Sequence, residues 1–218
     1  KALLNQADVA LPDGIGISLA AKFLKSQIPN LNDQRALKRI AGVEFMEELV
    51  ALAAKQGVQI GLIGGRAGLA VKALECLREK YQGLEGWAEE LGEISISDLS
   101  HIGDLGDLKK IAKKIKETGT QIVFVGLGAP KQEYFIEKLC FALGTRHSAL
   151  ILMSVGGSFD IIAGKIQRAP VFIRSIGFEW AWRLMKEPWR FRRQLSLLKF
   201  VWLVYCKKLA SQGDALRS

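Results

Sequence analysis

The chain has 218 residues, of which 49% are hydrophobic and 24% charged, so it can build a sizeable core and does not belong to the disordered classes. Its three cysteines are far apart and lack the spacing of a disulfide framework or a metal site, which favours a reducing compartment. No stretch approaches the roughly 20 apolar residues that a membrane span needs.

The net charge of +9 lies in the last quarter of the chain. Residues 165–218 hold twelve Lys or Arg against three acidic residues, whereas the charges of residues 1–164 cancel. Four of the five tryptophans also lie in this tail. Such asymmetry indicates a polyanionic partner, either nucleic acid or an anionic membrane. We therefore predict a body over residues 1–174 and a helical appendage over residues 175–218.

The body alternates helical and strand patterns. Helices are predicted over 17–25, 43–55, 69–80, 108–116 and 131–141. Strands are predicted over 58–63, 121–125 and 149–155. Loops are expected at 12–16 and 30–38, and no element is predicted for residues 84–107. Strands that alternate with helices predict an α/β fold with a Rossmann-like open, mainly parallel sheet covered by helices on both faces.

A glycine-bearing turn follows each predicted strand, at 64–68, 126–130 and 156–158. In an open α/β sheet these turns share the edge formed by the carboxyl ends of the strands, where ligands bind. Glycine lets the backbone approach a ligand, and the helix start that follows suits a phosphate. Candidate substrate-binding positions are thus Gly64, Gly126, Gly128, Gly156 and Gly157. The alternative interpretation is that these glycines only make tight connections.

Two common nucleotide motifs and a metal site are disfavoured. The pattern from Gly126 places Lys131 where the dinucleotide fingerprint has its third glycine, and no Gly-Lys-Ser/Thr of a P-loop occurs. His101 and His147 are isolated, and no Asp-x-Asp follows a predicted strand. We predict neither a metal nor a cofactor, so arginine, lysine and backbone amides would have to meet the charge of a nucleotide.

Five polar residues are candidates for the chemistry, each with a simpler alternative. Asp13, between a proline and a glycine, is either a turn former or a general base. Asp160 is either a first-turn helix acid or a ligand contact. Gln132 and Glu133 open a helix, where a glutamate is favourable for dipole reasons alone. Arg39 is either a ligand contact or a solvated arginine.

The tail predicts two helices, near 175–186 and near 189–209, separated by Pro188. In the second, an uncharged arc of about 140° holds the apolar side chains, including Phe191, Leu195, Leu198 and Trp202. Basic residues such as Lys199 occupy the rest, and no acidic residue lies between Pro188 and Lys208. This pattern favours docking on an anionic membrane. Packing on the chain's own core and binding of nucleic acid remain alternatives.

Several segments together resemble one family, the WecG/TagA/CpsF glycosyltransferases of bacterial cell-surface polymer synthesis. The matching segments run in the family's order over nearly the whole chain: 11–16, 39–42, 124–133, 155–160, 163–165, 168–170, 177–180, 183–184, 187–188 and 190. The resemblance implies a metal-independent, inverting transferase at the cytoplasmic face of the bacterial plasma membrane. It would move an N-acetylmannosamine-type sugar from a UDP-sugar donor to N-acetylglucosamine on an undecaprenyl diphosphate lipid.

The resemblance also assigns roles to residues. Asp13 matches the family's proposed catalytic base. The family's nucleotide-sugar contacts match Arg39, Gln132 and Asp160, and Lys131 and Glu133 lie beside Gln132 in the matching segment 124–133. The tail arginines that would meet diphosphate are Arg183, Arg190 and Arg193. The expected site is a sugar-nucleotide cleft at the open ends of the strands, roofed by these cationic side chains.

Family members carry a leading β-α-β segment before the position of Lys1, with a Thr-x-Asn-type turn that contributes a second active-site residue. The resemblance implies that this chain begins after that segment. A non-catalytic nucleotide- or lipid-binding module is therefore an alternative function. A basic nucleic-acid-binding protein is another, which the absence of helix-turn-helix, zinc and aromatic-sheet signatures disfavours. Association of copies in solution, through the surface that the tail would cover, is a further expectation.

Overall fold

The computed structural model describes residues 3–24, 39–65, 68–91, 105–144, 150–175, 178–186, 188 and 199–206. The chain divides into two units. The first, called here the sheet unit, comprises Lys1–Ala10 and Gly42–Gln167. The second, called the basic unit, comprises Leu11–Ala41 and Arg168–Ser218.

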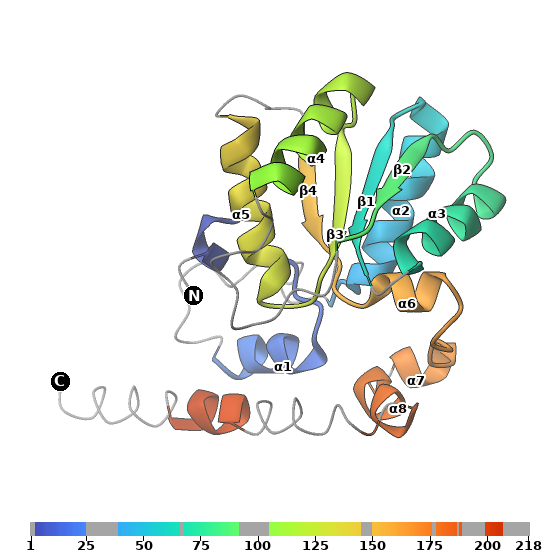
Figure 1. Ribbon diagram of the computed structural model, residues 1–218. Coiled ribbons are helices and arrows are strands. Elements are labelled where there is room, and N and C mark those ends of the chain that lie inside the picture. The colour runs from blue at the N-terminus through green and yellow to red at the C-terminus, as the bar shows by residue number, and fades with distance from the viewer. Residues whose placement is uncertain are drawn as a thin grey trace. The chain divides into compact units, whose positions relative to one another are not determined.

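In the part that the structure describes, the sheet unit is built on four parallel strands in the order β2-β1-β3-β4. Their bounds are β1 Ile60–Gly64, β2 Gly86–Glu89, β3 Ile122–Gly126 and β4 Ile151–Ser154. β1 and β3 run side by side over their whole length, so that Ile60 pairs with Ile122 and Gly64 with Gly126 (Figure 1). The three predicted strands are confirmed, and so is the predicted α/β fold with an open parallel sheet.

Helices cover both faces of this sheet, as predicted (Figure 1). One buried cluster joins strand residues to α2 Gly42–Gln56, α3 Leu69–Lys80 and α6 Ser158–Ile162. The other joins them to α4 Leu105–Thr118 and α5 Lys131–Leu143. A single turn of 3-10 helix, η1 Leu3–Gln6, contacts α5.

The two inner strands are buried on both faces because apolar side chains occupy both sides of each. On β3, Phe124 belongs to the α2–α3–α6 layer, whereas Val123 and Val125 belong to the α4–α5 layer. Such continuous apolar runs are typical of parallel sheets covered on both sides. β4 lies at an edge and is only partly buried, with Ile151 47% exposed.

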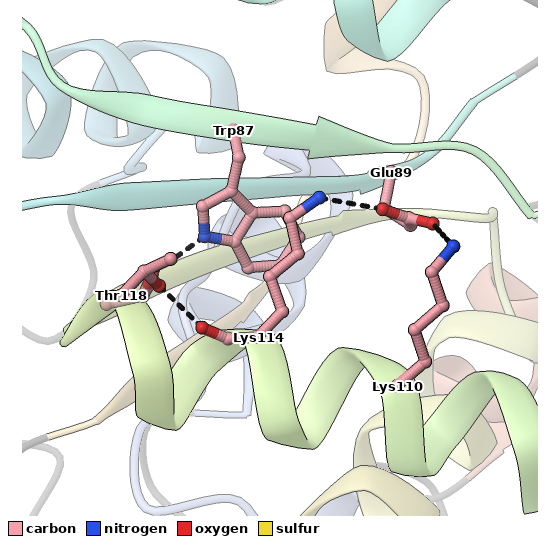
Figure 2. Close-up of polar contacts among 6 residues, drawn as sticks. Trp87, Glu89, Lys110, Lys114 and Thr118 are labelled. Atoms are coloured by element: carbon pink, nitrogen blue, oxygen red, sulfur yellow. Dashed lines mark hydrogen bonds and ion pairs between the residues drawn. The ribbon is translucent and has the colours of Figure 1, made fainter.

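β2 lies in the stretch for which no element was predicted, and polar contacts join it to α4 (Figure 2). The Nε1–H of Trp87 donates to Thr120 Oγ1 at 2.8 Å. Lys110 and Lys114 of α4 pair with the Glu89 carboxylate at 2.6 and 2.8 Å. The Lys114 ammonium also lies 4.7 Å from the centroid of the Trp87 ring. β2 is thus held in place by side-chain contacts with residues distant in sequence, which its own four residues do not predict.

Among its described residues, the basic unit contains three short helices, α1 Ile15–Phe23, α7 Val171–Ser175 and α8 Glu179–Lys186, and residues 199–206 are also helical. The helix predicted near 175–186 thus corresponds to α8, with α7 before it. Of the helix predicted near 189–209, the structure describes 199–206. The loop predicted at 30–38 lies outside the described residues. Within the described ranges, no helix combines the length and apolar character needed to cross a bilayer.

Candidate functional site

Three turns meet at the carboxyl edge of the sheet unit, after β1, β3 and β4. The Gly65 N–H donates to the Gly126 carbonyl at 3.0 Å, which joins the first turn to the second. The Val155 N–H donates to the Val125 carbonyl at 2.9 Å, which extends the sheet pairing into the third turn. The prediction that the glycine-bearing turns share one edge is therefore confirmed, and we call this group the turn cluster (residues 64–65, 126–132 and 155–160).

Close packing explains glycine at two positions of the turn cluster. A Cβ on Gly126 would stand 2.6 Å from the Phe159 ring and 3.2 Å from the Gly156 carbonyl oxygen. A Cβ on Gly64, whose φ is +90°, would stand 2.6 Å from the Leu127 side chain. Real Cβ atoms essentially never stand 2.6 Å from another atom, and the buried Phe159 ring beside Gly126 leaves no room for a side chain there. At Gly64 the contact is the end of a leucine side chain, and the positive φ also favours glycine. This supports the structural alternative for these two glycines without bearing on ligand contact.

The side chain of Gln132 links the second turn to the third. It is only 7% exposed. Its Oε1 accepts the Gly156 N–H at 3.0 Å, and its Nε2 donates to Glu133 Oε1 at 2.9 Å. Both polar atoms of the amide therefore have protein partners, and Gln132 sets the spacing of the two turns. The other carboxylate oxygen of Glu133 is buried and has no hydrogen-bond partner within the described ranges.

The remaining predicted residues of the cluster lie at helix starts. Lys131 is the first residue of α5, and Gly157 is the N-cap of α6. Asp160 is half-buried in the first turn of α6. Ser158, which the prediction placed in the third turn without a site role, is 4% exposed and donates from Oγ to the Val155 carbonyl at 2.7 Å.

The helix start after the first turn already carries an anion. The Gly68 N–H, at the N-cap of α3, donates to the carboxylate of Glu90, which follows β2. α5 likewise has a carboxylate in its first turn, that of Glu133, although its N-cap, Pro130, makes no side-chain hydrogen bond. An acidic group therefore lies near both helix starts.

In the basic unit, the turn that carries Asp13 is fixed through its main chain. The Asp13 N–H donates to the Leu11 carbonyl at 2.9 Å, and the Asp13 carbonyl accepts Arg39 Nε–H at 2.8 Å. Beside it, the Ile40 N–H donates to the Pro12 carbonyl at 3.2 Å. The side chain of Asp13 is exposed. An exposed carboxylate on a fixed backbone is an arrangement suited to a general base.

Arg39 makes two further contacts, both far away in the sequence. Its Nη1 donates to the Arg174 carbonyl at 3.2 Å, and its Nη2 pairs with Glu179 Oε2 at 2.8 Å. The two charged side chains are 23% and 12% exposed, respectively. The alternative of a merely solvated arginine is therefore wrong. Glu179 had been given no role; the available signal was that it is one of only three acidic residues in a basic tail.

The structure places only part of the predicted tail site. Arg183 lies within α8. Lys199 and Trp202 lie in the helical segment 199–206, both with exposed side chains. The other predicted residues lie outside the described part of the chain: Arg190, Arg193, Phe191, Leu195 and Leu198.

An open parallel α/β sheet whose strand ends carry glycine-bearing turns defines the class of Rossmann-like α/β proteins, in which ligands bind at that edge of the sheet. The model of the glycosyl transferase WecG/TagA/CpsF family matches residues 1–214, and the chain belongs to this family. It is therefore a glycosyltransferase, an enzyme that transfers a sugar from a donor to an acceptor. The resemblance noted from the sequence segments is confirmed.

Proposed function

We propose that this glycosyltransferase moves an N-acetylmannosamine-type sugar from UDP to an N-acetylglucosamine carried on a polyprenyl diphosphate, with inversion and without a metal ion. Asp13 is the catalytic base. The observation that carries this assignment is the main chain of Asp13, held at both its N–H and its carbonyl while the carboxylate is exposed.

In the reaction, the acceptor hydroxyl oxygen attacks the anomeric carbon of the donor sugar from the face opposite UDP. The bond from that carbon to the diphosphate oxygen breaks, and UDP leaves with the electron pair as an anion. The hydroxyl proton passes to the Asp13 carboxylate. General-base catalysis of this kind contributes about 10²- to 10⁴-fold to the rate.

The departing diphosphate charge has to be stabilised by the protein. We assign this to the backbone of the turns at Gly126–Gly128 and Gly156–Gly157, to Lys131, and to the tail arginines Arg183, Arg190 and Arg193. Arg39 retains N–H groups beyond its three hydrogen bonds, since a guanidinium carries five. Arg39 can therefore also donate hydrogen bonds to the UDP-sugar, and the Asp160 carboxylate can accept one.

We further propose that the basic unit docks on the anionic cytoplasmic face of the membrane, where a lipid-linked acceptor is found. The charge pattern and the exposed apolar side chains of residues 199–206 support this: Val201, Trp202, Leu203 and Tyr205 are each at least 50% exposed. Basic residues near such a surface contribute about 1 kcal/mol each.

The test is Asp13→Asn, assayed for sugar transfer and for UDP-sugar affinity. Turnover should fall by about 10²- to 10⁴-fold while donor affinity stays within about twofold. Asp107→Asn, an exposed acid in the first turn of α4, is the matched control and should keep its activity. Full turnover by Asp13→Asn would rule out Asp13 as the base.

The metal-free part of the proposal has its own test. A chelator should leave transfer by the wild-type chain unchanged, because the proposed charge stabilisation uses only protein groups. Loss of activity in EDTA that returns with added Mg²⁺ or Mn²⁺ would contradict it.

A further inference from the structure

The guanidinium of Arg39 connects three segments of the basic unit that are distant in sequence. Nε–H binds the Asp13 carbonyl, 26 residues away; Nη1 binds the Arg174 carbonyl, 135 residues away; and Nη2 binds the Glu179 carboxylate, 140 residues away. Arg174 lies in the last turn of α7 and Glu179 in the first turn of α8. The Asp13 turn is thereby tied to the junction of these two helices.

Each partner suits its place electrostatically. A cation is favourable beside the carbonyls at the end of a helix, and a carboxylate is favourable in the first turn of one. The pair is mostly shielded, with the Glu179 side chain 12% exposed and that of Arg39 23% exposed. Hydrogen bonds between charged groups are stronger than neutral ones, and loss of one partner leaves the other charge partly buried. Glu179 therefore decides where the guanidinium is held.

We propose that Glu179 is a positioning residue for the reaction, which rests on the proposed role of Asp13. Glu179 fixes the Arg39 guanidinium, and Arg39 in turn fixes the carbonyl of Asp13, so the direction in which the Asp13 carboxylate is presented depends on a residue of α8. Glu179 does not touch the reacting atoms. The Asp13 side chain has only two rotatable bonds, so a displacement of its backbone also displaces its carboxylate.

The inference is tested by Glu179→Ala and Glu179→Gln, each assayed for kcat and for the KM of the UDP-sugar. Displacement of a catalytic group by about 1 Å can cost about a hundredfold in rate. We expect kcat of Glu179→Ala to fall by about 10- to 100-fold. Donor KM should rise by less than kcat falls, because the turn cluster is not altered and only the proposed contact of Arg39 with the donor is disturbed. Glu179→Gln keeps an oxygen that accepts from Arg39 Nη2 and should retain an intermediate kcat, even if the alanine variant folds poorly.

Amide hydrogen exchange supplies a readout that does not depend on activity. The Ile40 N–H binds the Pro12 carbonyl beside the bond from Arg39 to Asp13. Its exchange should become at least about tenfold faster in Glu179→Ala, since loss of the ion pair loosens the turn. Unchanged exchange together with unchanged kcat in both variants would overturn the inference, as would a rise in donor KM with kcat retained.

The matched control is Glu47→Ala. Glu47 also forms an ion pair, with Lys80 at 2.5 Å, but it lies in α2 of the sheet unit. It should leave kcat and Ile40 exchange unchanged. Asp13→Asn, run alongside, separates the two proposals. Full turnover by Asp13→Asn with faster Ile40 exchange in Glu179→Ala would refute the base while leaving the tie between Glu179 and the turn intact.

Discussion

The basic unit and the sheet unit differ strongly in net charge. The basic unit holds sixteen Lys and Arg against five Asp and Glu, a net charge of +11. The sheet unit holds fifteen against seventeen, a net charge of −2. A unit with so large an excess of one sign attracts partners of the opposite sign, whereas a nearly neutral unit is suited to building a core. The difference in charge therefore suits the sheet unit to forming the core and the basic unit to binding an anionic partner.

Their apolar side chains differ in the same way. Those of the sheet unit gather in two buried clusters against the faces of the sheet. In the basic unit, large apolar side chains are exposed on each helical segment that the structure describes, for example Leu19 at 58%, Phe172 at 67%, Met185 at 69% and Trp202 at 63%. Exposed apolar groups beside basic ones are typical of membrane-surface helices. The comparison therefore predicts that substitutions in one unit change stability and those in the other change docking.

The largest effect on stability is expected from Gly126→Ala in the sheet unit. The added Cβ would stand 2.6 Å from the Phe159 ring and 3.2 Å from the backbone oxygen of Gly156, and overpacking of this kind costs about 2–3 kcal/mol. Gly119→Ala is the control, because its φ is +64° but a Cβ there meets nothing within 4 Å. It should cost about 1 kcal/mol from backbone strain alone. Urea unfolding measures both, and equal losses would contradict the packing argument.

A smaller effect, on membrane affinity, is expected from Trp202→Ala in the basic unit. The side chain is 63% exposed, so its removal should leave the unfolding free energy within about 0.5 kcal/mol. Binding to vesicles with anionic lipid should weaken by about 1–2 kcal/mol, roughly tenfold. Phe141→Ala, a 91% exposed aromatic of the sheet unit, is the matched control and should bind as the wild type does. Equal losses in the two variants would remove the distinction between the units.

The sequence predicts the elements of the sheet unit well because their periodicity is strong and local. α3 was predicted with its observed bounds, Leu69–Lys80, since glycines precede it and an apolar face recurs through it. β2 was missed because it has four residues, one of them Gly86 and one the charged Glu89. Its place is set by pairing with β1 and by Lys110 and Lys114, which lie more than 20 residues away.

In the candidate site, too, the features with a local sequence signal were predicted and the contacts between distant residues were not. Glycine after each strand is a local signal, so the turns were found. The bond between Gln132 and Gly156 joins residues 24 apart, and that between Arg39 and Glu179 joins residues 140 apart. Hydrogen-bond partners so far apart cannot be predicted from the pattern of any single stretch of sequence. They become visible only when the fold brings the segments together, and they give Gln132 and Arg39 structural roles beside the binding roles assigned by family resemblance.

The smallest effect is expected from Glu89→Gln, at the contact between β2 and α4 (Figure 2). Burial of the Glu89 carboxyl raises its pKa, but hydrogen bonds from Lys110 and Lys114 outweigh burial and hold the pKa below its ordinary value of 4.5. A carboxyl whose pKa is lowered by folding stabilises the protein above its unfolded pKa. That contribution disappears as the pH falls through the folded pKa.

Glu89→Gln should therefore lower the unfolding free energy at pH 7 by about 1 kcal/mol, since one cationic partner is largely exposed and screened by solvent. The difference from wild type should shrink as the pH falls below the ordinary value of 4.5 and through the lowered pKa. Urea unfolding at pH 7, 5 and 3 measures it. Glu85→Gln, an exposed residue just before β2, should show no difference at any of these values. A Glu89→Gln deficit that persists unchanged at pH 3 would mean that packing, rather than the charge of Glu89, joins β2 to α4.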